Sequence, residues 1–447
     1  MTTFTQGISR RNLLAGSAGL AGAAVLSGCI GTGDQGTTPD QQQTPPSDTT
    51  TDGGNTSPAD IPREVVLQSN MQDEGPRAAL AAVVGNINDY DVTINTVATS
   101  QFRAQLPTYL TSSQAPDVLT WYAGSVTNSF AAEGLLHDVS EVWNNGNASP
   151  FSAALKDLST FEGKQYFVPT NYYWWALFHR KSSFESWGVQ APETWDDFMG
   201  LLDNLQSQGV APLTTGLANN AWMAAAWFDY LNLRVNGADY HRELLAGQHS
   251  FNSDEVRAVM ERYAEILPYF HPDSLSWDPQ QAAAPIAREE AGMYLVGTFA
   301  TAYWPEDQQD DLDFFSVPII DPNIPTAEEA PTDGFMVAAN AQNPEGGQAV
   351  ADYLASAEAQ QQFIEQAVSP NLPTHPDVDT SNFSPLVQKG LDLLNNTDQI
   401  TQFFNRDSND ELQGTADDAL MRFINNPSDV DAILSDWQTA AEQVFAQ

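Results

Sequence analysis

The sequence predicts an α/β protein built from two lobes, and two observations support this fold class. Apolar runs of strand length alternate along the chain with longer segments whose apolar residues recur at helical spacing. Such alternation is typical of sheets joined by crossover helices. Beyond Arg63 about 385 residues remain, which is enough for two lobes that each bury a core.

The predicted elements follow this alternation in order. A helix over residues 77–87 comes after Gly75-Pro76 and separates two short strands. Thr194 is a suitable N-cap for a later helix, and the last hundred residues are mostly helical in pattern. The predicted strands are residues 65–67, 92–97, 117–121, 293–296, 314–320 and 334–339, and the further predicted helices are residues 102–110, 194–208 and 254–267.

The N-terminal region resembles an export signal. An arginine pair, Arg10-Arg11, is followed by a short apolar stretch and then Leu-Ser-Gly before Cys29, as in a twin-arginine signal that ends in a lipoprotein cleavage site. Cys29 is the only cysteine in the chain, so no internal disulfide can form and its thiol can accept a lipid. The alternative is a membrane helix, but the apolar run from Leu13 to Ser27 is shorter than the ~20 residues needed to span a bilayer.

We therefore expect residues 1–28 to be a cleaved signal. The mature chain would begin at Cys29 on the extracellular face of the cytoplasmic membrane, tethered there rather than embedded. One acyl chain holds weakly, so stable anchoring requires two chains or a second signal. Residues 29–62 are rich in Thr, Gln, Asp and Pro and are predicted to form a disordered stalk.

The charge of the chain restricts its partners. With 17 basic and 58 acidic side chains the formal net charge is −41, and such a field destabilises a compact state unless salt screens it. We interpret this as a protein of an extreme halophile; a mildly acidic periplasmic protein is the alternative. Nucleic acids and anionic membrane surfaces are not expected partners, because both require clusters of Lys and Arg.

Catalytic motifs are missing from the sequence. The six histidines form no H-E-x-x-H or other metal-ligand spacing, and no G-x-S-x-G or P-loop sequence occurs. A glycosidase pair could be proposed from any two of the 58 acids, so such a pair carries little information. We expect no enzyme activity, no cofactor and no metal.

Aromatic residues are more informative, because several of the eleven tryptophans lie in clusters. Neighbouring rings on a strand point to opposite faces, so half of each cluster leaves the core. A ring at the carboxyl end of a strand in an open α/β sheet faces the ligand crevice, where flat rings suit the apolar faces of sugars. We expect pocket positions for Trp121, Tyr172 and Trp222, and core positions for Trp174, Trp175 and Trp227.

Several segments of the chain resemble segments that follow one another in the same order in a known family. This family is family 1 of the extracellular solute-binding proteins of sugar-importing ABC transporters, whose members are similar to maltose-binding protein. The resemblance runs from about Val65 to Gln447. Phe299 stands where the family more often has Trp. The segments are residues 115–121 (APDVLTW), 134–139 (GLLHDV), 166–169 (YFVP), 175–181 (WALFHRK), 194–198 (TWDDF), 291–299 (AGMYLVGTF), 331–337 (PTDGFMV) and the helix over 344–363.

The resemblance implies the periplasmic-binding-protein fold, in which two discontinuous α/β lobes enclose a ligand cleft. The chain would cross between lobes near Pro169, Pro318 and Pro370. The first lobe would comprise residues 63–168 and 319–370, and the second lobe residues 169–318 and 371–447.

The resemblance also implies ligand contacts. Trp121, with Tyr122 beside it, would be the stacking ring of the first lobe and Phe299 the platform of the second. Asp333 and Gly334 would give a polar contact near the cleft. Further candidates for ligand contact are Asn70 and Gln72 after the first strand, and Arg406 and Asp407 in residues 404–407 (FNRD); for Asn70, Gln72 and Asp407 a surface position is the alternative.

The implied function is capture of a sugar or oligosaccharide by a monomer that closes around it and delivers it to an ABC permease. A ligand favours the closed form only through the extra contacts that it makes there. One alternative is a sister protein for another cargo, such as an oligopeptide, a polyamine, glycerol phosphate or iron. The other is a secreted glycoside hydrolase or polysaccharide-binding protein.

Overall fold

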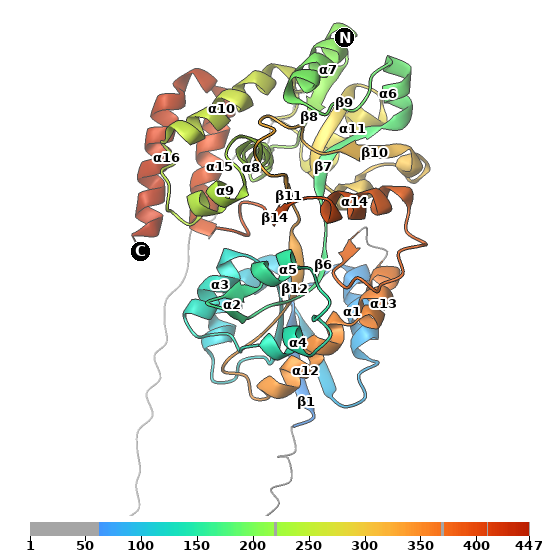
Figure 1. Cartoon of the computed structure of the whole chain (residues 1–447), viewed down its shortest axis with the longest axis vertical. Helices are drawn as coiled ribbons and strands as arrows, with labels where there is room; N and C mark the ends of the chain where they lie inside the picture. Colours follow the sequence, from blue (N-terminus) through green and yellow to red (C-terminus); the bar gives the residue numbers. More distant parts are fainter. Residues whose placement is uncertain (1–61, 219–220, 368–370, 409, 447) are drawn as a thin grey trace, which may run out of the picture. The chain divides into compact units, whose positions relative to one another are not determined.

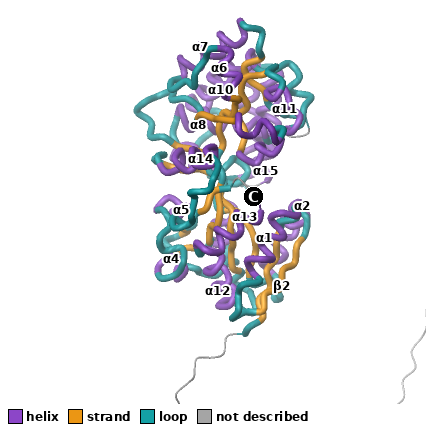
Figure 2. Tube along the Cα trace, turned by 90° about the vertical axis from the view of Figure 1, so that its right-hand side faces the viewer, coloured by secondary structure: helices purple, strands orange, loops and turns teal. Residues whose placement is uncertain are grey.

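The computed structural model describes residues 62–218, 221–367, 371–408 and 410–446. The predicted signal and nearly all of the predicted stalk, including Arg10, Arg11 and Cys29, lie outside these residues. Two separate sheets, each flanked by helices, confirm the predicted α/β class (Figures 1 and 2). Within the described ranges no helix combines the length and apolarity needed to cross a bilayer.

The first sheet has six strands in the order β13-β6-β12-β3-β1-β2. Strands β1, β2 and β3 are parallel, whereas β12 and β6 run antiparallel to their neighbours. Its strands are β1 (Glu64–Ser69), β2 (Asp91–Thr96), β3 (Val118–Tyr122), β6 (Val168–Tyr172), β12 (Thr332–Val337) and β13 (Leu372–Pro373).

The second sheet has four strands in the order β10-β7-β9-β8. There are also two small two-stranded sheets, β11 with β14 and β4 with β5, and the second of these packs against α3 (Ser125–Ala132) and α4 (Ser140–Asn144) of the first lobe. The strands are β7 (Trp175–Arg180), β8 (Ala211–Thr214), β9 (Ala291–Gly297), β10 (Leu312–Phe315), β11 (Ala327–Glu329), β14 (Gln399–Thr401), β4 (Thr160–Phe161) and β5 (Lys164–Gln165).

The helices fall into three groups along the chain: before β6, between β7 and β10, and after β12. The first group is α1 (Glu74–Val84), α2 (Thr99–Thr111), α3 (Ser125–Ala132), α4 (Ser140–Asn144) and α5 (Ala153–Leu158). The second is α6 (Lys181–Trp187), α7 (Trp195–Ser207), α8 (Met223–Val235), α9 (Ala238–Leu245), α10 (Asp254–Ile266) and α11 (Pro279–Ala287). The third is α12 (Pro344–Ala355), α13 (Ala357–Ala367), α14 (Pro385–Asn395), α15 (Asp410–Asn425) and α16 (Val430–Phe445), and short 3-10 turns cover Leu267–Tyr269, Thr298–Tyr303, Glu306–Asp311 and Pro427–Asp429.

Local sequence signals explain several helix starts. The hydroxyl of Thr194 accepts a hydrogen bond from the Asp197 amide and caps α7, as predicted. Gly75 and Pro76, expected to precede a helix, lie inside the first turn of α1. Proline is tolerated there because the first-turn amides have no intrahelical acceptor.

The passages between the two sheets differ from the prediction at two points. Pro169 does not mark a crossing, because it lies within β6 and pairs with Gly334 of β12 at a register shift that accommodates its missing N–H. The chain instead leaves the first sheet between Tyr172 and the start of β7. The predicted passage near Pro318 lies in the segment between β10 and β12, and Pro370 lies outside the described residues. Strand β13, which the predicted boundaries assign to the second lobe, pairs with β6 in the first sheet.

The cores contain the aromatic residues predicted for them. Trp174, Trp175 and Trp227 are at most 2% exposed and belong to the core built on the second sheet. A separate core that includes Phe102 and Leu119 packs against the first sheet. Each sheet therefore has its own hydrophobic core, as the length of the chain suggests.

Candidate functional site

A polar pocket opens where β1 and β3 end. It has a volume of about 360 Å³, and parallel strands β1 and β3 bring their carboxyl ends to the same edge of the sheet. Ligands of open α/β sheets bind at this edge. The lining residues are Asn70, Met71, Gln72, Asp73, Pro76, Thr99, Arg103, Thr120, Trp121, Tyr122, Asn171, Asp333, Phe363, Asn371, Asn405 and Arg406.

Six residues predicted to contact the ligand meet in this pocket: Asn70, Gln72, Trp121, Tyr122, Asp333 and Arg406. Antiparallel pairing of β12 with β3 explains part of this, because it aligns Asp333 with Tyr122. The loop after β1 supplies Asn70 and Gln72, and the segment before α15 supplies Arg406.

Asn70 is fixed by the neighbouring strand. The Thr120 hydroxyl donates to Asn70 Oδ1 at 2.9 Å, and the Asn70 amide donates to the same hydroxyl at 2.9 Å. These bonds leave the side-chain amide nitrogen of Asn70 as a potential donor toward the pocket. Gln72 is exposed, so its side chain is available to a ligand.

Trp121 is more buried than a stacking platform usually is. Only 4% of the residue is exposed, and its ring stacks on Phe102 and Tyr122 with centroids 5.7 and 4.1 Å away. Because β3 is central in the sheet, all five of its residues are buried. The Trp121 ring is therefore mostly part of the core, and only one edge of it lines the pocket.

Two guanidinium groups lie close to the Tyr122 ring. Arg103 donates to its hydroxyl at 2.7 Å and lies 5.7 Å from the ring centroid. Arg406 lies 4.9 Å from the same centroid. Arg103 was not among the predicted contacts, although its position on α2, the helix before β3, was a usable signal.

An ion pair forms the charged part of the pocket. Arg406 Nη1 contacts Asp333 Oδ1 at 2.7 Å, and Arg406 Nη2 donates to the Tyr173 hydroxyl at 3.3 Å. Burial by itself lowers the pKa of Arg406, but the Asp333 carboxylate outweighs burial and raises that pKa, so the guanidinium stays charged. Paired opposite charges give the pocket both a donor and an acceptor without a large net charge.

Two further polar residues in the pocket were also missed. The Asn371 amide donates to Asn171 Oδ1 at 2.7 Å, joining β6 to the chain just before β13. The chain was expected to cross to the second lobe near Pro169, so Asn171 was not considered for a site on this sheet.

Gly334 and Asp407 lie beside the pocket but do not line it. A Cβ on Gly334 would lie 2.1 Å from the Val168 carbonyl oxygen, so glycine is required there by the close approach of β6. Asp407 is 8% exposed and accepts a hydrogen bond from the Ser125 amide at 3.1 Å, at the start of α3. Burial raises the pKa of Asp407 to about 6.

The other three predicted rings do not line this pocket. Tyr172 lines a different cavity together with His375 and Leu391. Trp222 packs edge-on against Trp175 and Phe403, both on the second lobe. Phe299 packs against Tyr173 with centroids 6.0 Å apart, and so reaches the pocket only through the tyrosine that contacts Arg406.

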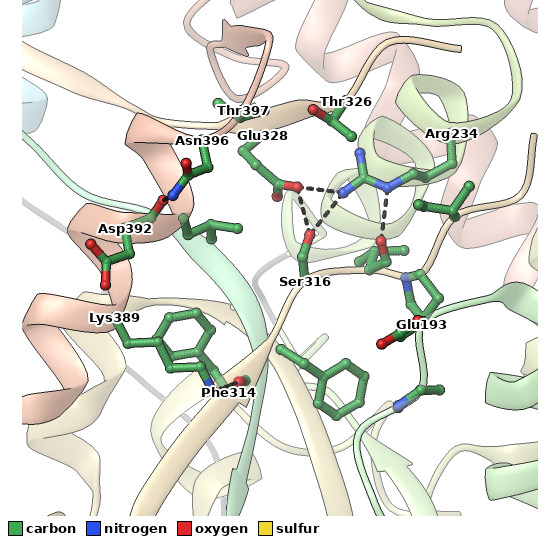
Figure 3. Close-up of a pocket in the computed structure, with 16 residues that line it drawn as sticks. Glu193, Arg234, Phe314, Ser316, Thr326, Glu328, Lys389, Asp392, Asn396 and Thr397 are labelled. Carbon is green, nitrogen blue, oxygen red and sulfur yellow. Dashed lines mark hydrogen bonds and ion pairs between the residues drawn. The ribbon is translucent and has the colours of Figure 1, made fainter. Parts of the chain in front are cut away.

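A second, larger cavity lies beside β10 and α14. It has a volume of about 580 Å³, and Figure 3 shows Arg234 and Glu328 on its wall, joined to each other and to Ser316. Arg234 also donates to the carbonyl oxygens of Val317 and Ala327. Its guanidinium is thus occupied by protein groups. Among the described residues no group of three or more His, Cys, Asp or Glu side chains is arranged to hold a metal ion.

Comparison with known protein families gives one match. Residues 74–361, more than half of the chain, match the family described as bacterial extracellular solute-binding protein.

Two curated proteins illustrate the relatives. An uncharacterized ABC transporter extracellular-binding protein of Pyrococcus horikoshii is 23% identical over 300 residues, 66% of this chain and 66% of that protein. A probable sugar-binding periplasmic protein of Mesorhizobium japonicum is 28% identical over 183 residues, 40% of this chain and 43% of that protein. The chain thus matches less than two thirds of the length of these relatives.

Solved structures match over more of the chain. The bacterial solute receptor AcbH, described as exclusively preferring β-D-galactopyranose, is 28% identical with a TM-score of 0.81 and covers 86% of this chain and 99% of its own. A chitin oligosaccharide binding protein is 16% identical with a TM-score of 0.73 and covers 86% of this chain and 100% of its own. The second match supports the two-lobe fold alone.

Proposed function

The chain belongs to the bacterial extracellular solute-binding protein family, which confirms the resemblance seen in its sequence, and from this premise we propose that it captures a neutral sugar for an ABC importer. The ligand would occupy the pocket at the ends of β1 and β3. The observation that carries the proposal is the Arg406–Asp333 pair beside the Tyr122 ring.

The chemistry of the pocket supports a sugar. A pyranose presents apolar C–H faces and a rim of hydroxyls that both donate and accept. Tyr122 and the edge of Trp121 offer aromatic surface, while Asn70, Arg406 and Asp333 offer donors and an acceptor. A charged ligand would leave one member of the ion pair unfavourably placed, whereas hydroxyls satisfy both.

The size of the pocket favours a short ligand. Its volume of about 360 Å³ is near the lower end of the ~300–1,000 Å³ common for ligand pockets. The likeness to AcbH, which prefers a monosaccharide, points the same way. We therefore propose a mono- or disaccharide.

Hinge closure would complete the site. The half-buried rings Trp222 and Phe299 belong to the second lobe and adjoin Phe403 and Tyr173, near the segment that carries Arg406. We propose that closure brings this aromatic surface against the exposed side of the bound sugar. A ligand that touches both lobes would then shift the population toward the closed form, which the permease distinguishes from the empty protein.

A titration of sugars tests the proposal. Calorimetry in molar NaCl with D-galactose, D-glucose, D-xylose, raffinose and glycerol phosphate should give binding of at least one neutral sugar and no hydrolysis product. Binding of glycerol phosphate alone would support the alternative cargo. Release of free sugar from raffinose would support the hydrolase alternative.

The anchor and the export route are separate proposals. We propose that Arg10 and Arg11 direct export, that Cys29 carries a lipid, and that the mature protein works in high salt on the outer face of the cytoplasmic membrane. In the native host, Cys29→Ser should move the protein from the membrane fraction to the medium. Arg10→Lys with Arg11→Lys should instead retain the precursor inside the cell. A Cys29→Ser protein that stays membrane-bound would contradict the anchor.

A further inference from the structure

A pair of buried carboxyl groups lies behind the pocket. Asp229 on α8 and Glu329 at the end of β11 are both 0% exposed. Their side chains lie within hydrogen-bonding range of each other. The function proposed above makes no use of either group.

The hydrogen-bond acceptors of this pair outnumber the donors. Asp229 Oδ2 accepts from the Phe404 amide at 2.9 Å. Among the described residues, Asp229 Oδ1 and both carboxyl oxygens of Glu329 have no donor. Two ionised carboxylates can only accept, so in this arrangement a proton on one group is the donor that the other lacks.

Within the described part of the chain, no neighbouring cation donates to the carboxyl oxygens of this pair in place of the proton. Arg234 on α8 is paired with Glu328, the neighbour of Glu329, at 2.6 Å. On α9, His241 Nε2 lies 4.0 Å from Asp229 Oδ1, beyond hydrogen-bond distance, while its Nδ1 faces the Asn232 amide. The remaining charged or titratable groups nearby are Tyr173 after β6, Tyr230 of α8, Arg242 of α9 and Asp407.

Electrostatics agrees with the geometry. Burial raises the pKa of Asp229, and burial together with the Asp229 charge raises the pKa of Glu329 further. Burial lowers the pKa of His241, so this ring is neutral near pH 7 and supplies no compensating charge. The pair therefore titrates as a unit.

The pair is connected to the pocket through two chain segments. Glu329 immediately precedes residues 330–333, which lead into β12 and carry Asp333. Asp229 holds the amide of Phe404, two residues before Arg406. The same two segments are joined by β11–β14 pairing and by the bond from the Thr332 amide to Gln402 Oε1 at 3.0 Å.

We propose that Asp229 and Glu329 share one proton and act as positioning residues, holding together the segments that bring Asp333 and Arg406 into the pocket. The predicted effect on sugar binding rests on the proposed function, whereas the shared proton does not. Loss of the shared proton would leave two like charges buried side by side, which is unfavourable in a medium of low dielectric. The segments would then separate, and binding would weaken in alkaline solution.

Infrared difference spectroscopy tests the shared proton without any sugar. Wild-type protein near pH 7 should show the carbonyl band of a buried protonated carboxyl group, and Asp229→Asn and Glu329→Gln should each remove or shift it. The half-buried carboxyl of Asp417, on α15, provides a matched control, and Asp417→Asn should leave the band in place. A wild-type spectrum without the band, or one unchanged in both variants, would overturn the proposal.

Calorimetry with D-galactose tests the positioning role. Asn at position 229 can accept from the Phe404 amide and donate to Glu329 without a proton. Asp229→Asn should therefore retain the affinity and lose its alkaline decline, which in the wild type should reach about tenfold per unit of pH once the pair loses its proton. Asp229→Ala removes the acceptor and should weaken binding at every pH.

The two experiments separate the two proposals. If D-galactose and the other sugars fail to bind, the proposed function is wrong, but the infrared band still shows whether Asp229 and Glu329 share a proton. If sugar binds with the same pH profile in wild type and Asp229→Asn, the positioning role is wrong. If Asp229→Ala does not fold, the positioning role is still tested by comparing the wild type with Asp229→Asn and Glu329→Gln.

Discussion

Two arginine–carboxylate pairs of similar geometry occur in different surroundings. Arg234 contacts Glu328 at 2.6 Å beside the cavity in Figure 3, with side chains 7% and 4% exposed. Arg406 contacts Asp333 at 2.7 Å in the pocket at the ends of β1 and β3, with side chains 15% and 31% exposed. Both cavities are large enough for a small ligand, so volume does not distinguish them.

The difference lies in what else each guanidinium contacts. Arg234 donates to two backbone carbonyls and to Ser316 as well as to Glu328, at distances of at most 2.8 Å. The further donations of Arg406, to the Thr332 carbonyl and the Tyr173 hydroxyl, are 3.5 and 3.3 Å long. All three guanidinium nitrogen atoms of Arg234 are used in strong contacts that hold the fold together. Arg406 can replace its two weak contacts with stronger hydrogen bonds to a ligand.

The largest expected effect concerns the stability of the fold. Arg234→Ala leaves Glu328 buried without its cation, and we expect the free energy of unfolding to fall by about 3–5 kcal/mol. Urea denaturation in molar NaCl measures this loss. Arg288→Ala, which breaks a pair with about half-exposed side chains, is the matched control and should change stability by less than about 1 kcal/mol.

Arg406→Ala should act mainly on binding. Loss of a charged donor facing the ligand should weaken D-galactose binding by about 2 kcal/mol, roughly thirtyfold, measured by calorimetry. The same Arg288→Ala variant should bind as the wild type does. Equal affinity in a folded Arg406→Ala protein would show that the two arginine pairs have the same, purely structural role.

A smaller effect is expected at Tyr122. Tyr122→Phe keeps the ring but removes the hydroxyl that accepts from Arg103, and we expect binding to weaken by about 1 kcal/mol. Tyr269→Phe, which removes a hydroxyl bonded to Asp203 on the surface of the second lobe, is the control. Equal losses in both variants would argue against a local effect on the pocket.

The smallest effect is the pH dependence of the Arg406 segment. Burial raises the pKa of Asp407 to about 6, so the folded protein binds more protons than the unfolded chain between about pH 4 and that value. The contribution of Asp407 to stability should therefore decrease as pH rises through this range, and Asp407→Asn should flatten the profile measured by urea denaturation.

Asp311 provides a comparison of opposite sign. Burial raises the pKa of Asp311, but hydrogen bonds from Ser182 and Arg180 outweigh it and lower the pKa overall. The stability that Asp311 contributes is present above the ordinary carboxyl pKa and is lost as pH falls. Asp311→Asn should therefore reduce stability at neutral pH, whereas Asp407→Asn should not.

Particular residues show how far the sequence could predict the site. Asn70, Trp121 and Tyr122 follow or end strands that are readable as short apolar runs, so their place at the carboxyl ends of these strands was predicted correctly. Arg103 was missed because no ligand contact was predicted on α2. Asn171 was missed because the predicted boundary after residue 168 placed it in the second lobe, whereas β6 belongs to the first sheet. For Trp222 and Phe299 the predicted ligand contact stays a prediction, since both lie on the second lobe outside this pocket.

The sequence by itself determined the α/β class, the family and the rings that form the core, because periodicity and motif order are local properties of the chain. The resemblance in residues 404–407 marked Arg406 as a candidate, but only the tertiary structure shows why Arg406 can contact a ligand and Arg234 cannot. Their roles depend on carbonyl, carboxyl and hydroxyl groups brought from distant segments, and packing alone fixes those long-range contacts.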